Sequence, residues 1–115
     1  MDEFGESDPS NTAVAQQTAP PAPTNLTAIY YSGPPATVAL AWGHPWPLGV
    51  TFSVYRNSRS PVPILPKYRI ASGLTERSYN DTNGRLYYWY AVTAVNANGE
   101  SGPSNEAQAL RPRGD

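Results

Sequence analysis

Residues able to carry out chemistry are few in this chain, and they lie apart in the sequence. The single histidine, His44, is flanked by Gly43 and Pro45, and the chain contains no cysteine. A nucleophilic or metal site needs several such groups that converge in a cleft. With no second imidazole and no thiolate, that site would have to consist of carboxylates and hydroxyls. We therefore expect no catalytic residue, no metal and no cofactor, and we expect His44 to be an exposed imidazole in a loop.

An oxygen-rich stretch, Asp81-Thr82-Asn83-Gly84, contains residue types that calcium sites use. The stretch lacks the spacing of an EF-hand loop, and a plain Asx turn explains the same residues. Nucleotide binding has no support either, because no glycine-rich loop follows a strand and opens a helix. We predict a turn between two strands here.

Aromatic side chains are a sharper candidate for binding. Tyr87 and Trp89 are predicted to point outward from one strand and Tyr55 from a neighbouring strand, with Tyr68 widening the group. Cross-strand neighbours on one face of a sheet lie about 5 Å apart, so these rings can form one exposed platform. Flat exposed rings stack on sugar faces or anchor protein partners. The alternative is that arginines cover the rings, which then only stabilise cross-strand packing.

Composition places these residues in a small domain that has no strongly charged surface. The chain has 115 residues, of which 39% are hydrophobic and 15% charged, and its net charge is −1. This length suits one domain, and we expect a monomer. No basic stripe or acidic run stands out, so we expect neither nucleic-acid binding nor electrostatic attachment to a membrane. Membrane insertion is not expected, because no apolar run approaches the roughly 20 residues of a membrane helix.

The chain divides into three predicted regions. Residues 1–18 are polar and acidic without any period, and we expect a disordered leader or linker there. Prolines from residue 20 to residue 23 favour an extended, semi-rigid hinge. Residues 19–111 form the predicted domain, and residues 112–115 form a disordered tail.

From Asn25 onward, hydrophobic and polar residues alternate with a period of two, which indicates β-strands. Glycine and proline separate the alternating segments, and no window has a convincing helical period. The predicted strands cover residues 26–30, 38–42, 52–55, 68–70, 78–80, 86–96 and 107–110. Asn98-Gly99 is predicted to form a tight hairpin turn. Seven short strands in about 90 residues predict an all-β fold, a seven-stranded antiparallel β-sandwich.

One layer of side chains is expected to fill the space between the two sheets, which lie about 10 Å apart in such folds. Trp42 is large enough to occupy the middle of that space. The predicted inner set is Leu26, Val38, Leu40, Trp42, Phe52, Val54, Ile70, Tyr79, Tyr88, Tyr90, Val92 and Ala94.

The order of these motifs resembles that of fibronectin type III domains. Residues 88–96, which read Tyr-x-Tyr-x-Val-x-Ala-Val-Asn, and Gly99-Glu100-Ser101 are similar to the F strand and the F–G turn of that family. Trp42 followed by Pro45 is similar to its B-strand tryptophan and the proline after it. The resemblance covers residues 19–111 and implies an immunoglobulin-like sandwich.

The resemblance also implies a role for Tyr88. This residue would form the tyrosine corner, with its ring packed inward and its hydroxyl tying the connection between strands E and F. The family usually has leucine six residues before that tyrosine, and here the position is Thr82.

A function without catalysis follows from the same resemblance. Similar bacterial modules often sit between catalytic and carbohydrate-binding domains of secreted enzymes that degrade polysaccharides. We therefore expect an extracellular spacer or linker whose partners are neighbouring domains of the same polypeptide. The alternative is a module that binds polysaccharide or a protein partner through Tyr55, Tyr87 and Trp89. Some family members bind integrins through Arg-Gly-Asp in the F–G turn, but here Arg113-Gly114-Asp115 lies after the last predicted strand, and we interpret it as a fragment boundary or tag.

Overall fold

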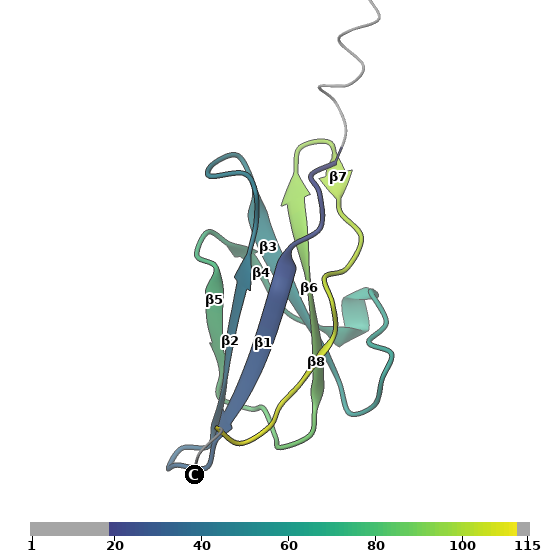
Figure 1. The fold of residues 1–115 in the computed structure, drawn as a ribbon. Helices are drawn as coiled ribbons and strands as arrows, with labels where there is room; N and C mark the ends of the chain where they lie inside the picture. The colour runs from purple at the N-terminus through teal and green to yellow at the C-terminus, as the bar shows by residue number, and fades with distance from the viewer. Residues whose placement is uncertain (1–18, 113–115) are drawn as a thin grey trace, which may run out of the picture.

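The computed structural model describes residues 19–112, which form two antiparallel sheets packed face to face (Figure 1). The predicted leader and Arg113-Gly114-Asp115 lie outside the described residues. The first sheet has the strand order β1–β2–β5, with β1 at Thr24–Tyr31, β2 at Thr37–Gly43 and β5 at Ser78–Asp81. The second sheet has the order β4–β3–β6–β7, with β8 also paired to β6. Its strands are β3 (Thr51–Asn57), β4 (Arg69–Leu74), β6 (Trp89–Asn96), β7 (Gly99–Glu100) and β8 (Ala107–Gln108). The predicted sandwich is confirmed.

Strand β6 begins three residues later than the alternation predicted. Tyr87 has a φ of 73°, in the left-handed region, and the backbone N–H of Tyr88 donates to the carbonyl of Arg85 at 3.1 Å. A turn therefore occupies residues 86–88, which the side-chain pattern assigned to the strand. The alternation of residue types continues through these positions, so the sequence pattern alone does not reveal the turn. The hairpin turn is also displaced by one residue: Asn96 pairs with Gly99, so Ala97 and Asn98 form the turn.

The segment between β3 and β4 contains one 3-10 turn, η1 (Pro66–Tyr68). Tyr68 thus precedes β4, whereas the alternation placed it in the strand. Proline at the start of η1 suits a helical first turn, since it needs no N–H there. Within residues 19–112, no helix is long and apolar enough to cross a membrane.

Nine of the twelve predicted inner residues are buried in the core between the sheets, together with Ala28 and Ala109, whereas Ile70, Tyr79 and Tyr88 are only partly buried against it. Trp42, Tyr90 and Val92 are 6%, 0% and 0% exposed. The rings of Trp42 and Phe52 meet edge to face, with centroids 5.5 Å apart. Full burial of a side chain as large as Phe contributes about 1.5–3 kcal/mol, so a few such residues dominate the stability of the domain. Tyr88 is only half-buried and packs against the edge of this core.

Candidate functional site

The predicted aromatic platform on β3 and β6 is not exposed. Tyr55 lies directly opposite Ala91, on the outer face that the alternation predicted, but it is only 1% exposed. Val62, from the loop between β3 and η1, forms a buried cluster with these two residues, and Tyr68 and Trp89 pack against that cluster. The prediction that Tyr55 is exposed is wrong, because the proline-rich loop lies on the sheet and replaces water over the ring.

Two carboxylates hold the covered face together. The carboxylate of Glu106 accepts hydrogen bonds from the backbone N–H of Val62 at 2.6 Å and from the hydroxyl of Ser60. The hydroxyl of Tyr55 donates to the carboxylate of Glu100. Burial, and then the hydrogen bond to Glu100, raise the pKa of Tyr55. The loop is therefore fastened to the sheet, and this face has no flat stack of rings for a sugar.

Tyr87, the third predicted platform residue, is exposed but lies elsewhere. It belongs to the turn before β6, is 58% exposed, and its N–H donates to the carbonyl of Ala109 at 2.7 Å. Because its φ is positive, it does not continue the strand that carries Trp89. The structure therefore does not bring Tyr55, Tyr87 and Trp89 into one exposed surface.

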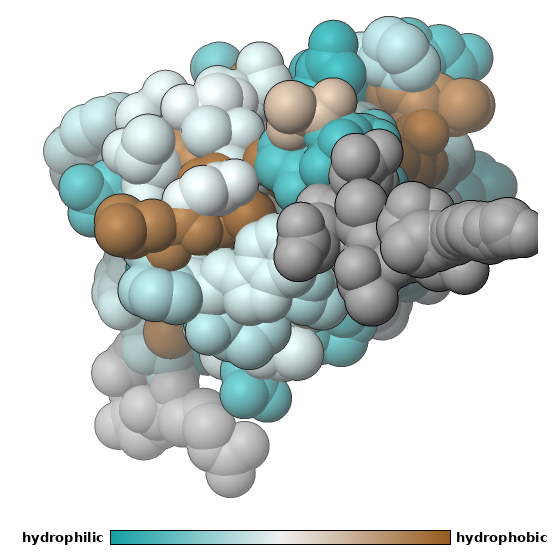
Figure 2. All heavy atoms as spheres, turned by 90° about the horizontal axis from the view of Figure 1, so that it is seen from above, coloured by the Kyte–Doolittle hydropathy of each residue, from teal (hydrophilic) through white to brown (hydrophobic). Residues whose placement is uncertain are grey.

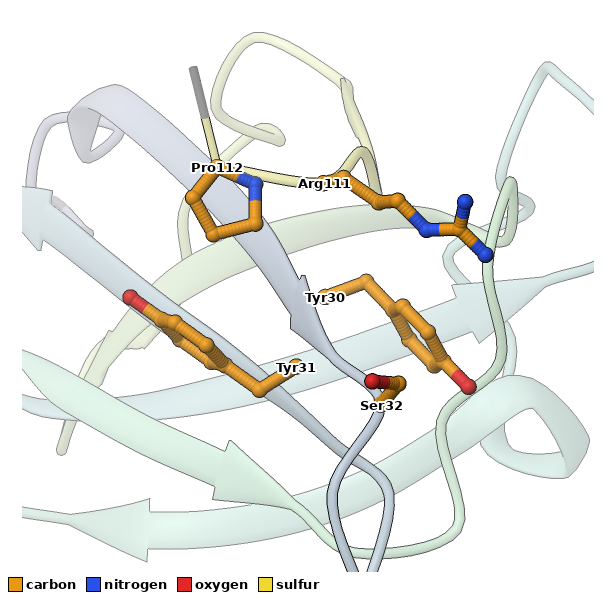
Figure 3. Close-up of a pocket in the computed structure, with 5 residues that line it drawn as sticks. All are labelled: Tyr30, Tyr31, Ser32, Arg111 and Pro112. Carbon is orange, nitrogen blue, oxygen red and sulfur yellow. The ribbon is translucent and has the colours of Figure 1, made fainter. Parts of the chain in front are cut away.

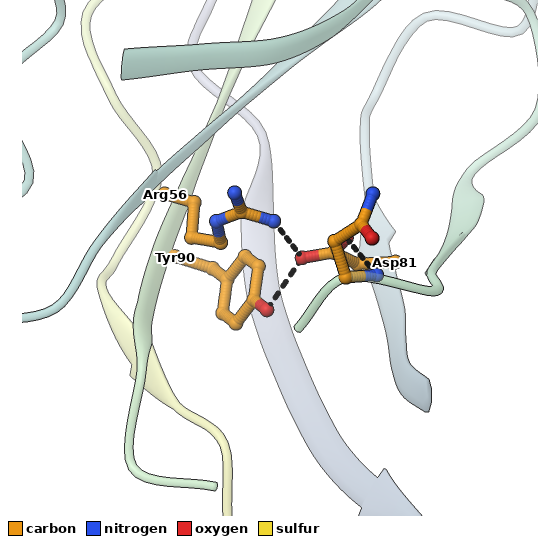
Figure 4. A network of polar contacts seen from close by, with 4 residues as sticks. Arg56, Asp81 and Tyr90 are labelled. Carbon is orange, nitrogen blue, oxygen red and sulfur yellow. Dashed lines mark hydrogen bonds and ion pairs between the residues drawn. The ribbon is translucent and has the colours of Figure 1, made fainter. Parts of the chain in front are cut away.

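The tyrosine that ties β5 to β6 is Tyr90, not Tyr88. The Tyr90 hydroxyl donates to Asp81 Oδ2 at 2.7 Å, and Arg56 Nη1 donates to the same oxygen at 2.8 Å (Figure 4). Burial, and then the hydrogen bond to the Asp81 carboxylate, raise the pKa of Tyr90. Within residues 19–112 the Tyr88 hydroxyl has no hydrogen-bond partner, although its ring centroid lies 5.6 Å from Cζ of Arg56. The role predicted for Tyr88 is thus taken by Tyr90, whose hydroxyl reaches the buried carboxylate of Asp81.

The Asp81-to-Gly84 stretch forms the predicted Asx turn. Oδ1 of Asp81 accepts the N–H of Asn83 at 3.0 Å, and the Asp81 carbonyl accepts the N–H of Gly84 at 3.2 Å. Both carboxylate oxygens of Asp81 therefore have partners in the protein. Across residues 19–112, no group of three or more acidic or histidine side chains lies close enough together to hold a metal ion.

One end of the sandwich, which we call the N-terminal pole, consists of residues 19–23, the β2–β3 loop and the β6–β7 turn. His44 joins two of these segments. Its Nδ1 accepts the backbone N–H of Trp46 at 3.1 Å, so the proton of the neutral ring is on Nε2, 2.8 Å from the carbonyl oxygen of Pro21. The prediction that His44 is an exposed loop imidazole is wrong: the side chain is half-buried and hydrogen-bonds the proline-rich segment to the loop.

Ring contacts connect His44 to the core. The His44 ring meets Trp46 at 5.8 Å and Phe52 at 5.5 Å, both edge to face, and Phe52 in turn meets Trp42. Arg77 Nη2 donates to the carbonyl of Trp46 at 2.5 Å, and its Cζ lies 5.9 Å from the Phe52 ring centroid. The contacts with the Trp46 and Phe52 rings and the hydrogen bond from Trp46 N–H restrict the imidazole of His44. The core therefore fixes the position from which His44 donates to the proline-rich segment.

The part of the N-terminal pole that is uncovered in Figure 2 carries no broad hydrophobic area. Figure 2 views the molecule from this end, and the hydrophobic residues visible there form small separate groups among paler and hydrophilic ones. Leu48, in the β2–β3 loop, is 84% exposed, and a single exposed leucine is common on soluble proteins. This view of the pole offers no large apolar docking surface.

The opposite end, which we call the C-terminal pole, contains an open groove of about 410 Å³. The groove is lined by Tyr30, Tyr31, Ser32, Arg111 and Pro112 (Figure 3). A second hollow of about 300 Å³ shares Tyr30 and is lined by Ala36, Thr82, Asn83, Gly84 and Arg85. Chemically these hollows offer aromatic faces, hydroxyls and guanidinium donors, which are groups that bind ligands.

Sequence reasoning missed both poles. A usable signal existed for the first, because Gly43-His44-Pro45-Trp46 places two rings in a loop that proline and glycine restrict. No local signal existed for the second. Tyr30 and Arg111 are far apart in the sequence, and pairing between β1 and the last segment brings them together, with the Tyr30 N–H donating to the Leu110 carbonyl at 2.8 Å.

No protein-family model matches the sequence, and a search of curated proteins found no match. Solved structures do match. An Fn3-like protein from Clostridium thermocellum is 31% identical with a TM-score of 0.68, over 85% of this chain and 99% of that chain. The structure named FN3tt is 26% identical with a TM-score of 0.62, over 84% and 99% of the two chains. Pectate lyase Pel3 from Pectobacterium carotovorum, at 23% identity and a TM-score of 0.53, shares the fold over 78% of this chain and 28% of its own.

The first of these relatives is covered along almost its whole length, at an identity of 31%. This chain belongs to the fibronectin type III family.

Proposed function

We propose that this fibronectin type III module is a non-catalytic spacer in a larger extracellular protein, and that it holds the segments at its two poles a fixed distance apart. The path of the chain carries the proposal. Ala19 lies beside the β6–β7 turn at the N-terminal pole, and residues 110–112 lie at the other end of β1 (Figure 1). The eight residues of β1 span about 26 Å at about 3.3 Å per residue, so a chain that passes through the domain is carried from one pole to the other.

A fixed direction at the N-terminal pole supports the spacer role. Prolines at 20, 21 and 23 limit the conformations of the segment before β1. The His44 hydrogen bond to the Pro21 carbonyl then fastens that segment to the β2–β3 loop. A spacer needs this kind of restraint, because a free hinge at its start would allow any orientation of the preceding segment.

The similar structures support a module within a longer polypeptide. A matching domain makes up 28% of the pectate lyase Pel3 chain and 37% of a chain with titin domains A168–A170. We extend the proposal to a monomeric module of a secreted or surface protein, including a polysaccharide-degrading enzyme, whose partners are neighbouring domains. Support for this finer statement comes from the presence of the fold in a pectate lyase.

The test measures the distance between the poles. Because the chain has no native cysteine, Ala19→Cys and Ser32→Cys place two spin labels specifically, one at each pole. Electron–electron double resonance is expected to give one narrow distribution. The 13 residue steps between the two labelled positions span at most about 43 Å of backbone, given about 3.3 Å per extended residue. His44→Ala is expected to broaden that distribution, whereas Leu48→Ala in the same loop, which removes an exposed side chain, leaves it unchanged.

A broad distribution in the parent chain would overturn the spacer proposal. An unchanged distribution in His44→Ala would remove His44 from it. Release of reducing sugar from a panel of polysaccharides by the purified chain would contradict the non-catalytic part.

A further inference from the structure

We infer that the groove at the C-terminal pole is a binding site for an acidic saccharide, an oligosaccharide of hexuronic acid residues, formed by Tyr30, Tyr31 and Arg111. This site goes beyond the spacer function and does not depend on it. The inference rests on three features: unpaired cationic side chains, exposed rings beside them, and a backbone that holds both in place.

The first feature is positive charge that no described residue neutralises. Among residues 19–112, the side chains of Arg85 and Arg111 have no ion-pair or hydrogen-bond partner, and no acidic residue lines either hollow. The carboxylate nearest to Arg85 along the chain, Asp81, is 3% exposed and already accepts hydrogen bonds from Arg56 and Tyr90. Among residues 19–112 the carboxylate nearest to Arg111 along the chain is Glu106, which accepts hydrogen bonds from Ser60 and Val62 in the loop after β3. The pole is therefore locally cationic on a chain whose net charge is −1, and it favours an anionic ligand.

The second feature is the pairing of rings with these charges. Tyr31 is 48% exposed and Tyr30 is half-buried. Figure 3 shows the Arg111 guanidinium extending toward the side of the groove where the Tyr30 ring lies, and Pro112 on the side of Tyr31. A flat ring packs against the C–H face of a pyranose, and a guanidinium forms two parallel hydrogen bonds with a carboxylate. A hexuronic acid presents both groups on one unit.

The adjoining hollow repeats this combination and favours a saccharide over an acidic peptide. It shares the Tyr30 ring and adds Arg85, and Thr82 and Asn83 supply a hydroxyl and an amide that match sugar hydroxyls. Tyr30 therefore lines one hollow together with Arg111 and the other together with Arg85, which suits a ligand whose charge and apolar face recur in each unit. An acidic peptide offers carboxylates on flexible side chains but no rigid face to lie on the ring.

The third feature is a backbone that holds the groove in shape before any ligand binds. Tyr30 N–H donates to the Leu110 carbonyl at 2.8 Å, and Ala109 N–H donates to the Tyr88 carbonyl at 2.7 Å. Ala109 itself is 0% exposed. The segment that carries Arg111 is thus anchored between β1 and the β5–β6 connection, so binding orders little besides the arginine side chain.

The experiment is a titration of the ¹⁵N-labelled full chain with a galacturonic acid tetrasaccharide, followed by amide chemical shifts at low salt. We expect saturable shifts confined to residues 30–32, 82–85 and 109–112. Arg111→Gln is expected to weaken binding about tenfold, because it removes a charge-assisted hydrogen bond. Arg59→Gln, which removes the same charge from an exposed position in the loop after β3, is the matched control and is expected to bind like the parent.

Four results would overturn the inference. These are the absence of localised shifts, equal binding of an uncharged galactose tetrasaccharide, equal weakening by Arg59→Gln, and equal or tighter binding of a tetraglutamate peptide. Chemical shifts far from the groove, unchanged in Arg111→Gln, show that this variant is folded. The spin-label distance between the poles is measured without ligand, so failure of the saccharide site and failure of the spacer proposal are distinguishable.

Discussion

The two poles of the sandwich are constructed in different ways. At the N-terminal pole, edge-to-face rings run from Trp46 at the surface through His44 and Phe52 to the core. At the C-terminal pole, the supporting element is the buried carboxylate of Asp81, which accepts hydrogen bonds from Arg56 and Tyr90. Apolar packing closes the first pole. A polar network supports the second, where Arg85 and Arg111 have no ion-pair or hydrogen-bond partner in the described part of the chain.

This difference separates two kinds of use. A pole that is filled by packed rings has few unsatisfied groups, so it is suited to holding a neighbouring segment in a fixed direction. A pole whose guanidinium groups have no partner among residues 19–112 keeps donors for a ligand. On the two proposals above, the domain separates its neighbours at one end and binds a ligand at the other.

The largest expected effect tests the packing at the N-terminal pole. Phe52→Ala removes a ring that is 1% exposed and contacts both His44 and Trp42, so we expect a loss of about 3–5 kcal/mol in the free energy of unfolding, measured by urea denaturation. Leu48→Ala, in the adjacent loop and 84% exposed, should change stability by less than about 0.5 kcal/mol. Equal losses in the two variants would show that the rings do not support this pole.

The next effect tests how tightly the C-terminal pole is supported. A Cβ at Gly84 would lie 2.6 Å from Val38 Cγ2, 3.0 Å from Asp81 Oδ2 and closer still to the Tyr90 hydroxyl. Gly84→Ala therefore forces the network apart, and we expect a loss of about 1–3 kcal/mol by thermal or urea unfolding. Gly102→Ala is the matched control, because nothing lies within 4 Å of its Cβ position. A tolerated Gly84→Ala would mean that the network yields easily.

The smallest effect tests the polar network at the C-terminal pole through its response to pH. Tyr90→Phe leaves Asp81 with one hydrogen bond fewer, and we expect a loss of about 1–2 kcal/mol at neutral pH. Because the pKa of Tyr90 is raised in the folded protein, its contribution is complete below the unfolded pKa of about 10 and declines as the pH rises above it. The stability difference between the parent and Tyr90→Phe should therefore shrink above about pH 10. Urea unfolding in alkaline buffers measures it, and a difference independent of pH would contradict the assignment.

Much of the fold could be predicted from side-chain alternation, because strand residues face opposite sides with a period of two. Tyr90, Val92 and Ala94 face the core, and Trp89 and Ala91 face the other side, as the pattern predicted. The motifs of β2 and β6 likewise identified the family. Periodicity reports the direction of a side chain but not what covers it, so Tyr55 was assigned to the correct face and given the wrong exposure.

By itself, then, the sequence determined the sandwich, its family and the burial of the Trp42 indole, because these depend on local alternation and on residue size. Only the tertiary structure decided which tyrosine reaches Asp81, that His44 binds the proline-rich segment, and that Tyr30 and Arg111 share a groove. Each of these rests on a contact between residues distant in the chain, and such contacts form only once the sheets have packed and brought particular donors and acceptors within hydrogen-bond distance.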